Sequence, residues 1–283
     1  MKIFNSDRLK RYIYRMYCLF PFNRLIGSKE SIDVVIPCIE KDLQILPLCL
    51  QGIRKNIDNP VKDIYIVAPD TEMIRRFCTE NDLEYVDETS VLGFSPKELG
   101  LIINWKGRQV NRSGWLFQQF LKLSGKIGTC DNYICIDSDH ILINRHVFLT
   151  SNHIPVFYMS SENHVPYYRN IENLIGLKRR SSLSYVAHKM IFNKNNLVEL
   201  HKEIEQKNGG KTWIEAILHH YNRNELSGFS EFELYGNFVK KKKHRPWREL
   251  ALKYTELSSF EELERKYSGK YNSLTFPEYL NIS

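Results

Sequence analysis

Short apolar, β-branched runs alternate with amphipathic stretches along the first third of the chain. The run at residues 32–37 is followed by an amphipathic stretch at 42–56, and the run at 64–68 by a helix-like stretch at 71–80. Strands that alternate with helices in this way pair in parallel, and the helices cover the faces of the sheet. The sequence therefore predicts an α/β fold, in which ligands bind beyond the carboxyl ends of the strands.

Length and composition favour one main domain with an extension at each end. The 283 residues are 42% hydrophobic, which is an ordinary share for a globular protein with a core. We expect a basic amphipathic segment at residues 1–30, the main domain at 31–240 and a basic tail at 241–283.

Cysteine usage and hydropathy indicate a cytoplasmic protein. The six cysteines form no CxxC pair and have no histidine partner at zinc-finger spacing, which argues against a metal ribbon and a disulfide framework. The N-terminus carries no cleavable signal and no apolar run of about 18 residues. We therefore expect reduced thiols in the cytoplasm, with peripheral attachment to the inner face of the cytoplasmic membrane left open.

The positive charge of the chain predicts an anionic partner. It does not decide between nucleic acid, an anionic membrane surface and a phosphorylated small molecule. The net charge is +7, and basic residues gather in the N-terminal stretch and in the run at 240–248. On an N-terminal helix, apolar and basic side chains would take opposite sides: Leu9, Ile13, Met16 and Phe20 against Arg8, Arg11 and Arg15. Such a helix either lies on an anionic membrane surface or docks on the protein body with its arginines in solvent.

The strongest chemical signal is the triplet Asp137-Ser138-Asp139, which follows the apolar run at 133–136. Two carboxylates one residue apart, at the end of a buried strand, can share a hard divalent cation such as Mn²⁺ or Mg²⁺. That metal would neutralise a diphosphate. The third ligand is expected to be His188 or His244, either of which could instead contact a sugar. The alternative is a solvated acidic turn.

A second signal is the pair Glu231 and Glu233, close to Gly228 and Ser230. Either glutamate could act as the general base that takes a proton from an acceptor hydroxyl. The structural alternative is a helix start, with Ser230 as the N-cap and Glu233 completing a capping box. If that box forms, Glu231 is the better candidate for the base.

The remaining candidates would bind the nucleotide-sugar. Arginines ahead of a helix can hold phosphate oxygens, and tryptophan or glutamine can contact a sugar or a base. The loops after the first two predicted strands lie at the carboxyl edge of the sheet, so their residues are also candidates for binding the nucleotide-sugar. The candidates are Pro37, Cys38, Asp70, Arg108, Arg112, Trp115, Gln118, Gln119, Asp137 and Ser138.

Four blocks, taken in order, carry a resemblance to a known family. They are Val34-Val35-Ile36-Pro37, then residues 114–119, then 133–139, and finally 229–237 with Trp213 ahead of it. In these blocks the chain resembles the bacterial GT-A-like glycosyltransferases of polysaccharide and cell-surface glycan gene clusters. The resemblance spans most of residues 32–239, and its last block is the most specific.

The resemblance implies a GT-A fold, a Rossmann-type mixed sheet flanked by helices; the helical N- and C-terminal extensions that we expect lie outside it. It implies a metal at Asp137 and Asp139, and an acceptor side built from Glu231 and Glu233 with contacts at Trp213 and Ser230. His188, which is outside the four blocks, is expected from the residues alone to contact the acceptor or the sugar. The implied partners are a nucleotide-sugar donor, expected to be UDP-linked, and a glycan or lipid-linked acceptor.

Two other classes of function compete with this interpretation. The basic N-terminus and the run at 240–248 also suit a nucleic-acid or anionic-membrane binding module, with nucleic acid the less favoured partner. A phosphotransferase or nucleotidyltransferase could also use paired aspartates with a metal. It would need a phosphate-binding glycine loop, and the sequence has no GxxxxGK[ST] motif.

Overall fold

The computed structural model describes residues 12–14, 16, 24–179, 181 and 183–280, and its centre is a five-stranded sheet. In sheet order the strands are β3 (Glu84–Asp87), β2 (Val61–Ala68), β1 (Ile32–Pro37), β6 (Asn132–Ile136) and β9 (Lys189–Asn193). The first four run parallel, and β9 runs antiparallel to β6. The predicted α/β fold with a mixed, mostly parallel sheet is confirmed.

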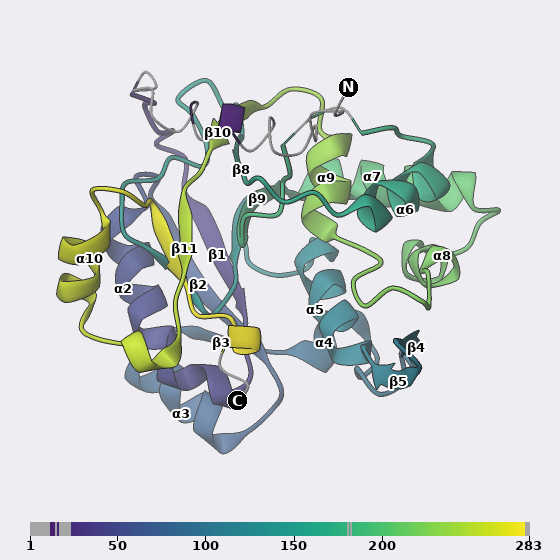
Figure 1. The fold of residues 1–283 in the computed structure, drawn as a ribbon, viewed down its shortest axis with the longest axis horizontal. Coiled ribbons are helices and arrows are strands. Elements are labelled where there is room, and N and C mark those ends of the chain that lie inside the picture. The colour runs from purple at the N-terminus through teal and green to yellow at the C-terminus, as the bar shows by residue number, and fades with distance from the viewer. Residues whose placement is uncertain (1–11, 15, 17–23, 180, 182, 281–283) are drawn as a thin grey trace, which may run out of the picture.

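Helices cover both faces of this sheet (Figure 1). On one side lie α2 (Leu46–Asn56) and α3 (Glu72–Glu80). On the other lie α4 (Glu88–Leu92), α5 (Ser113–Leu123), α6 (Val165–Ile175), α7 (Lys194–Lys207), α8 (Trp213–His220) and α9 (Glu231–Phe238). Side-chain caps begin several of them; Thr71 accepts from the Ile74 amide and Asn193 from the Asn196 amide.

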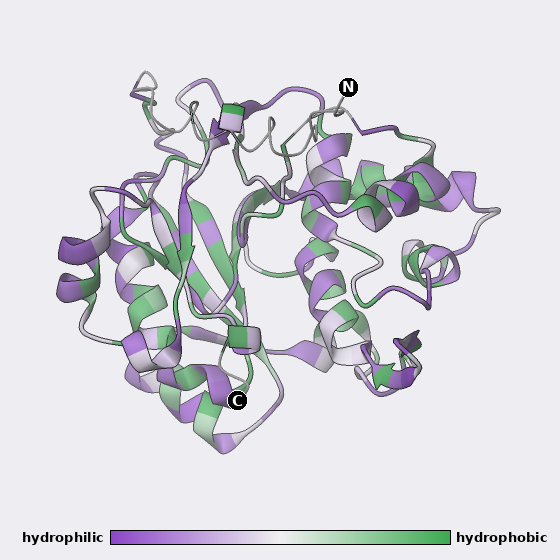
Figure 2. Ribbon diagram, viewed as in Figure 1, coloured by the Kyte–Doolittle hydropathy of each residue, from purple (hydrophilic) through white to green (hydrophobic). Residues whose placement is uncertain are grey.

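The core follows from the apolar runs of the sequence. Every residue of β1 is buried, and the central strands form the hydrophobic band between the more polar helices (Figure 2). Fully burying each such Val or Ile side chain contributes about 1.5–3 kcal/mol. Asp33, the polar exception in β1, is buried and accepts from the amides of Thr129 and Cys130 at 2.6 and 2.8 Å. Both amides donate to the same carboxylate oxygen, Oδ2.

The C-terminal residues expected to form a separate basic tail are packed against the main domain. Here β10 (Lys243–Pro246) pairs with β8 (Val156–Met159), and β11 (Glu249–Ala251) and β12 (Ser273–Thr275) form a sheet with β7 (His140–Leu142). The helix α10 (Phe260–Tyr267) contacts α2. These elements share a second hydrophobic core, formed by Ile45, Ile141, Ile143, Leu252, Phe260, Leu263, Leu274 and Phe276.

The short elements complete the described chain. A hairpin of β4 (Ile102–Trp105) and β5 (Arg108–Asn111) stands apart from the central sheet. Three 3-10 helices are η1 (Glu40–Gln44), η2 (Tyr254–Glu256) and η3 (Glu278–Leu280). None of the helices formed by the described residues has the length and apolar composition needed to cross a membrane.

Gly236 in α9 allows this helix to pack closely on Tyr185. A Cβ at this position would clash with Cγ of the buried Tyr185 ring. Alanine gains about 1 kcal/mol of helix propensity over glycine. Overpacking of a core costs typically 1–3 kcal/mol or more, so the clash should win. We expect Gly236→Ala to lower the free energy of unfolding by about 1–2 kcal/mol in urea titrations.

Gly269 provides the matched control, because a Cβ there meets no atom within 4 Å. Gly269→Ala should change the free energy of unfolding by less than about 0.5 kcal/mol. Equal effects of the two substitutions would contradict the packing described at Gly236.

Candidate functional site

A cavity of about 590 Å³ opens at the carboxyl edge of the central sheet. The strands β1 and β6 are parallel neighbours, so the loops that follow Pro37 and Ile136 meet at this edge. Many residues predicted as site residues line it: Pro37, Arg112, Trp115, Gln118, Gln119, Asp137, Ser138, Asp139 and His188. Its volume lies in the range of small-molecule sites.

Residues that the sequence analysis did not select complete the walls. They are chiefly Asp42, Glu88 and Lys122, together with Tyr254, Pro277, Glu278 and Tyr279 from the C-terminal segment. Lys41, also in the lining, belongs to the loop after the first predicted strand, which the sequence analysis placed at the site. Lys41 and Glu278 form an exposed ion pair at 2.7 Å that joins the two parts of the wall. The C-terminal segment is therefore part of the site.

Lys122 lies at the base of the cavity between two carboxylates. Its Nζ is 2.6 Å from Oδ1 of Asp137 and 2.9 Å from Oε1 of Glu231, and both Lys122 and Glu231 are almost fully buried. Burial alone would lower the pKa of Lys122, but Asp137 and Glu231 outweigh it and raise that pKa. This ammonium stays charged, and it ties α5 to the ends of β6 and α9.

His188 holds the other oxygen of Asp137. Its Nδ1 is 2.9 Å from Oδ2 of Asp137, and its Nε2 is 3.4 Å from Oε1 of Glu249. Burial opposes the imidazolium, yet Glu249 and Asp137 outweigh it and raise the pKa of His188 to about 10. Its backbone has a left-handed φ of 56°, which is costly for a residue other than glycine and typical of functional sites.

Asp137 is therefore already neutralised within the protein. Burial would raise the pKa of its carboxyl, but Lys122 and His188 outweigh burial and hold this pKa well below its usual range. Its backbone amide also donates to the carbonyl of His188 at 3.0 Å. The carboxylate is thus fixed in position by partners on both of its oxygens.

Asp139 has the opposite electrostatic environment. Burial, together with repulsion from Asp137, Asp42 and Glu249, outweighs the attraction of His188 and raises its pKa to about 6. Burial also raises the pKa of Asp42, whose Oδ2 accepts from the Ile39 amide at 3.1 Å and the Ser138 hydroxyl at 3.0 Å. His188 near Asp139 and Lys41 near Asp42 offset this effect of burial only in part.

A divalent cation would bind more favourably beside Asp139 and Asp42 than at Asp137, because Lys122 and His188 already pair with both oxygens of Asp137. Within the residues that the structure describes, no three His, Cys, Asp or Glu side chains are grouped to hold a metal by themselves. Mg²⁺ and similar ions are commonly held by one or two carboxylates and completed by substrate phosphates and water. Asp139, with Asp42 beside it, suits that arrangement.

The predicted third ligand His244 lies elsewhere. It is on β10, outside the cavity lining, and its Nε2 is 3.1 Å from the hydroxyl of Tyr185. Among the predicted histidines, His188 is the one at the cavity.

In the block at residues 229–237, Glu231 belongs to the site, whereas Ser230 and Glu233 stabilise the fold. Ser230 caps α9 by accepting from the Glu233 amide at 3.3 Å. The Glu233 carboxylate accepts from Tyr168 at 2.9 Å, Ser184 at 2.6 Å and the Tyr185 amide at 3.1 Å. This buried set of hydrogen bonds fixes α9 against α6 and the loop that precedes β9, while Glu231 reaches the cavity through Lys122.

Four other predicted residues also lie away from the cavity lining. Cys38 is buried, and burial raises the pKa of its thiol. Asp70 forms an exposed bidentate pair with Arg75. Arg108 is exposed on the β4–β5 hairpin, and Trp213 stacks on the ring of His201 at 4.4 Å between centroids.

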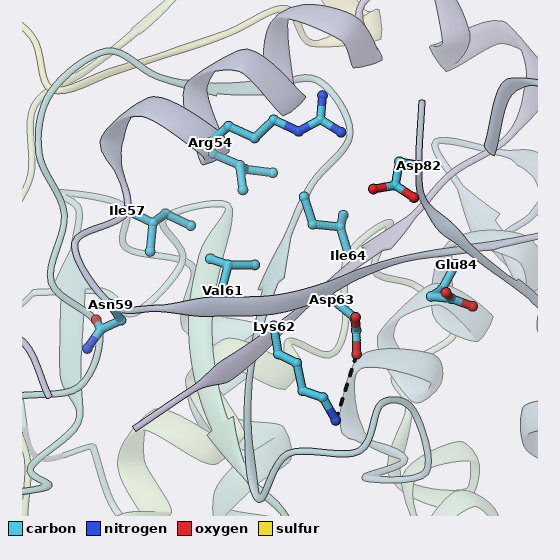
Figure 3. A pocket seen from close by; sticks show the side chains of 10 residues that line it. Arg54, Ile57, Asn59, Val61, Lys62, Asp63, Ile64, Asp82 and Glu84 are labelled. Atoms are coloured by element: carbon cyan, nitrogen blue, oxygen red, sulfur yellow. Dashed lines mark ion pairs between the residues drawn. The ribbon is translucent and has the colours of Figure 1, made fainter. Parts of the chain in front are cut away.

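A second cavity, of about 410 Å³, lies at the opposite edge of the sheet (Figure 3). It is lined by the end of α2 and the beginnings of β2 and β3, and includes Arg54, Lys62, Asp63, Asp82 and Glu84. The Lys62–Asp63 pair is a loose, surface one at 3.9 Å. Because ligands of parallel α/β sheets bind at the carboxyl edge, the cavity at Asp137–Asp139 is the stronger candidate.

Comparison with known proteins places the chain in a family but assigns no activity. The chain belongs to the family of unknown function DUF6492, whose match covers residues 29–277. Of the C-terminal residues that line the cavity, the match includes Tyr254 and Pro277. The comparison with curated proteins finds no match.

Proposed function

We propose that the chain is a glycosyltransferase that moves a sugar from a nucleotide-diphosphate sugar to a glycan or lipid-linked acceptor, in bacterial surface polysaccharide synthesis. The observation that carries the proposal is the cavity at the carboxyl edge of the sheet, where Asp42 and Asp139 both line the wall and burial raises the pKa of both carboxyls. The resemblance in four sequence blocks supports the same class of enzyme.

A metal, Mn²⁺ or Mg²⁺, would be held by Asp139 with Asp42 beside it. When bound, such an ion neutralises the diphosphate that leaves with the nucleotide. The sequence prediction also included Asp137 and His244. Both oxygens of Asp137 are held by Lys122 and His188, so we assign Asp137 to positioning these two cations at the cavity.

The shape of the cavity supports an elongated donor. Glu88 follows β3, while Asp139 follows β6, and three strand spacings separate these strands. Strands lie about 4.8 Å apart, so a lining that reaches from β3 to β6 covers roughly 14 Å of the sheet edge. That extent suits a nucleoside diphosphate, and we propose that its phosphates lie at Asp139 and its nucleoside toward Glu88.

Two further residues suit the nucleotide. The Arg112 guanidinium lies 4.3 Å from the centre of the Trp115 ring, and its Nε donates to the Leu226 carbonyl at 3.0 Å. The stacked pair presents a flat, positively charged surface to the cavity, as phosphate and base recognition require. Glu231, almost fully buried behind Lys122, would act by holding that lysine in place.

Thermal unfolding of the full chain with a panel of nucleotide-sugars tests this proposal. A ligand that binds only the folded state at about 100 times its Kd adds about 2.7 kcal/mol of stability. For a chain of this size the Tm should rise by about 5 °C or more with Mn²⁺ and one class of nucleoside diphosphate. If no member of the panel shifts the Tm with or without Mn²⁺, the proposal fails.

The alternative, a nucleic-acid binding module, predicts a different response. Affinity for RNA or DNA would then fall steeply with salt concentration. Nucleotide-sugars and Mn²⁺ would leave the Tm unchanged.

A further inference from the structure

The two basic segments of the sequence meet in the structure. The backbone amide of Trp247 donates to the hydroxyl of Tyr14 at 3.2 Å, and both side chains are buried. Tyr12, Tyr14 and Met16 have helical backbone, so part of the predicted N-terminal helix docks beside β10 (Figure 1). This contact brings N-terminal residues next to the basic run at 240–248.

Large apolar side chains are exposed around this contact. The exposed fraction is 62% for Tyr12, 44% for Ile13, 39% for Met16 and 71% for Ile26. The Ile26 carbonyl accepts from the Ser151 amide, in the loop that leads into β8, the partner strand of β10. Scattered exposed apolar residues are normal, but a group of them beside one strand indicates an interaction surface.

Lysines of the basic run lie at the end of α9 and the start of β10, where Lys240 and Lys241 also line a cavity with Glu199 and Glu203 of α7. Lys240, Lys241 and Lys243 are exposed, and the Lys243 amide donates to the Pro155 carbonyl at 2.8 Å, which attaches the run to the same loop. Lys242 instead donates to carbonyls at the end of α9. We name the surface formed by Tyr12, Ile13, Ile26, Lys240, Lys241 and Lys243 the basic apolar face.

We propose that the basic apolar face binds the surface of an anionic lipid bilayer. Apolar side chains that enter the headgroup region, flanked by lysines that contact anionic lipids, are the features of interfacial membrane binding. A nucleic-acid surface would need the lysines but gives no reason for exposed Ile13 and Ile26. The proposal is independent of sugar transfer and stands on the surface alone.

Sedimentation of the full chain with lipid vesicles tests the proposal. We expect binding to phosphatidylcholine vesicles that contain about 30% phosphatidylglycerol and much weaker binding to pure phosphatidylcholine. Ile13→Ser with Ile26→Ser should lower the affinity for the anionic vesicles by about tenfold or more, as should Lys240→Glu with Lys241→Glu.

Matched controls lie in other segments: Met73 on α3 and Ile102 on β4, two elements far from β10 in Figure 1, and Lys97 and Lys270 in turns. Met73→Ser with Ile102→Ser removes exposed apolar side chains, and Lys97→Glu with Lys270→Glu makes the same change in charge. Both controls should bind vesicles as the parent does, and all variants should share its unfolding midpoint.

Three results would overturn the proposal. The first is failure of the parent chain to bind the anionic vesicles. The second is a loss that is equal in the face variants and their controls. The third is binding to duplex DNA or RNA that the double lysine substitution abolishes, while the double isoleucine substitution changes neither DNA binding nor vesicle binding. That result would make the face a nucleic-acid surface.

Discussion

Lys122→Met is expected to lower the free energy of unfolding by about 3–5 kcal/mol at pH 7, because breaking a buried ion pair leaves an uncompensated charge. The substitution keeps the length of the side chain but removes the cation shared by Asp137 and Glu231. Equilibrium unfolding in urea measures the loss, with an unchanged m-value as the sign that the folded state stays compact.

The loss should depend on pH in a defined direction. In the parent chain the pKa of Asp137 lies below its usual range, so its stabilising contribution is present above about pH 4 and is lost as the pH falls. In the variant, Asp137 keeps its ion pair with His188, whereas the buried Glu231 loses the cation that lowered its pKa. Glu231 then binds a proton on folding, so the deficit should shrink between pH 7 and pH 5.

Lys55→Met is the control, since Lys55 forms a partly exposed pair with Glu264 at 2.6 Å. It should cost less than about 1 kcal/mol at either pH. A loss for Lys122→Met as small as that of the control would show that Lys122 does not hold the site together.

Asp139→Asn should reduce sugar transfer by about 100-fold or more while leaving the fold at least as stable. The substitution removes the carboxylate proposed to hold the metal. A metal in this position would stabilise the charge that develops on the leaving group in the transition state by several kcal/mol. Initial rates of nucleoside diphosphate release, measured with Mn²⁺ and the donor found in the thermal panel, give the activity.

The stability of the same variant gives an independent check. The folded pKa of Asp139, about 6, lies above the unfolded value of about 3.9. Its ionisation therefore opposes folding, and this cost appears as the pH rises from about 4 to above 6. Asn cannot ionise. At pH 8 we therefore expect the free energy of unfolding of Asp139→Asn to exceed that of the parent by about 1 kcal/mol or more.

Asp70→Asn is the matched control, an exposed carboxylate outside the cavity. It should change neither rate nor metal dependence. An Asp139→Asn enzyme with parental turnover would contradict the assignment of the site.

The sheet could be predicted because its signals are local. The β-branched run at 32–37 is the strand β1 residue for residue, and the run at 133–136 differs from β6 by one residue. The C-terminal strands could not be predicted in this way. The short strands β11 and β12 are defined by pairing with each other and with the distant β7, which local pattern does not reveal.

The cavity was partly predictable for a topological reason. Residues that follow parallel strands gather at one edge, so Pro37 and the triplet were placed together before their side chains were known. Lys122 was missed because its partner Glu231 lies far along the chain. A usable signal was present: Lys122 stands within the apolar, buried stretch at the end of α5, where a lysine needs a partner.

Calorimetric titration of a nucleoside diphosphate into the full chain tests the central claim most directly. The parent should bind the nucleotide tightly with Mn²⁺ and about tenfold or more weakly when the metal is chelated, because Asp139 and the phosphates complete one metal site. Asp139→Asn should lose the metal-dependent part of the affinity. Equal affinity of parent and variant, or binding that Mn²⁺ does not change, would contradict a metal-dependent nucleotide-sugar site at Asp139.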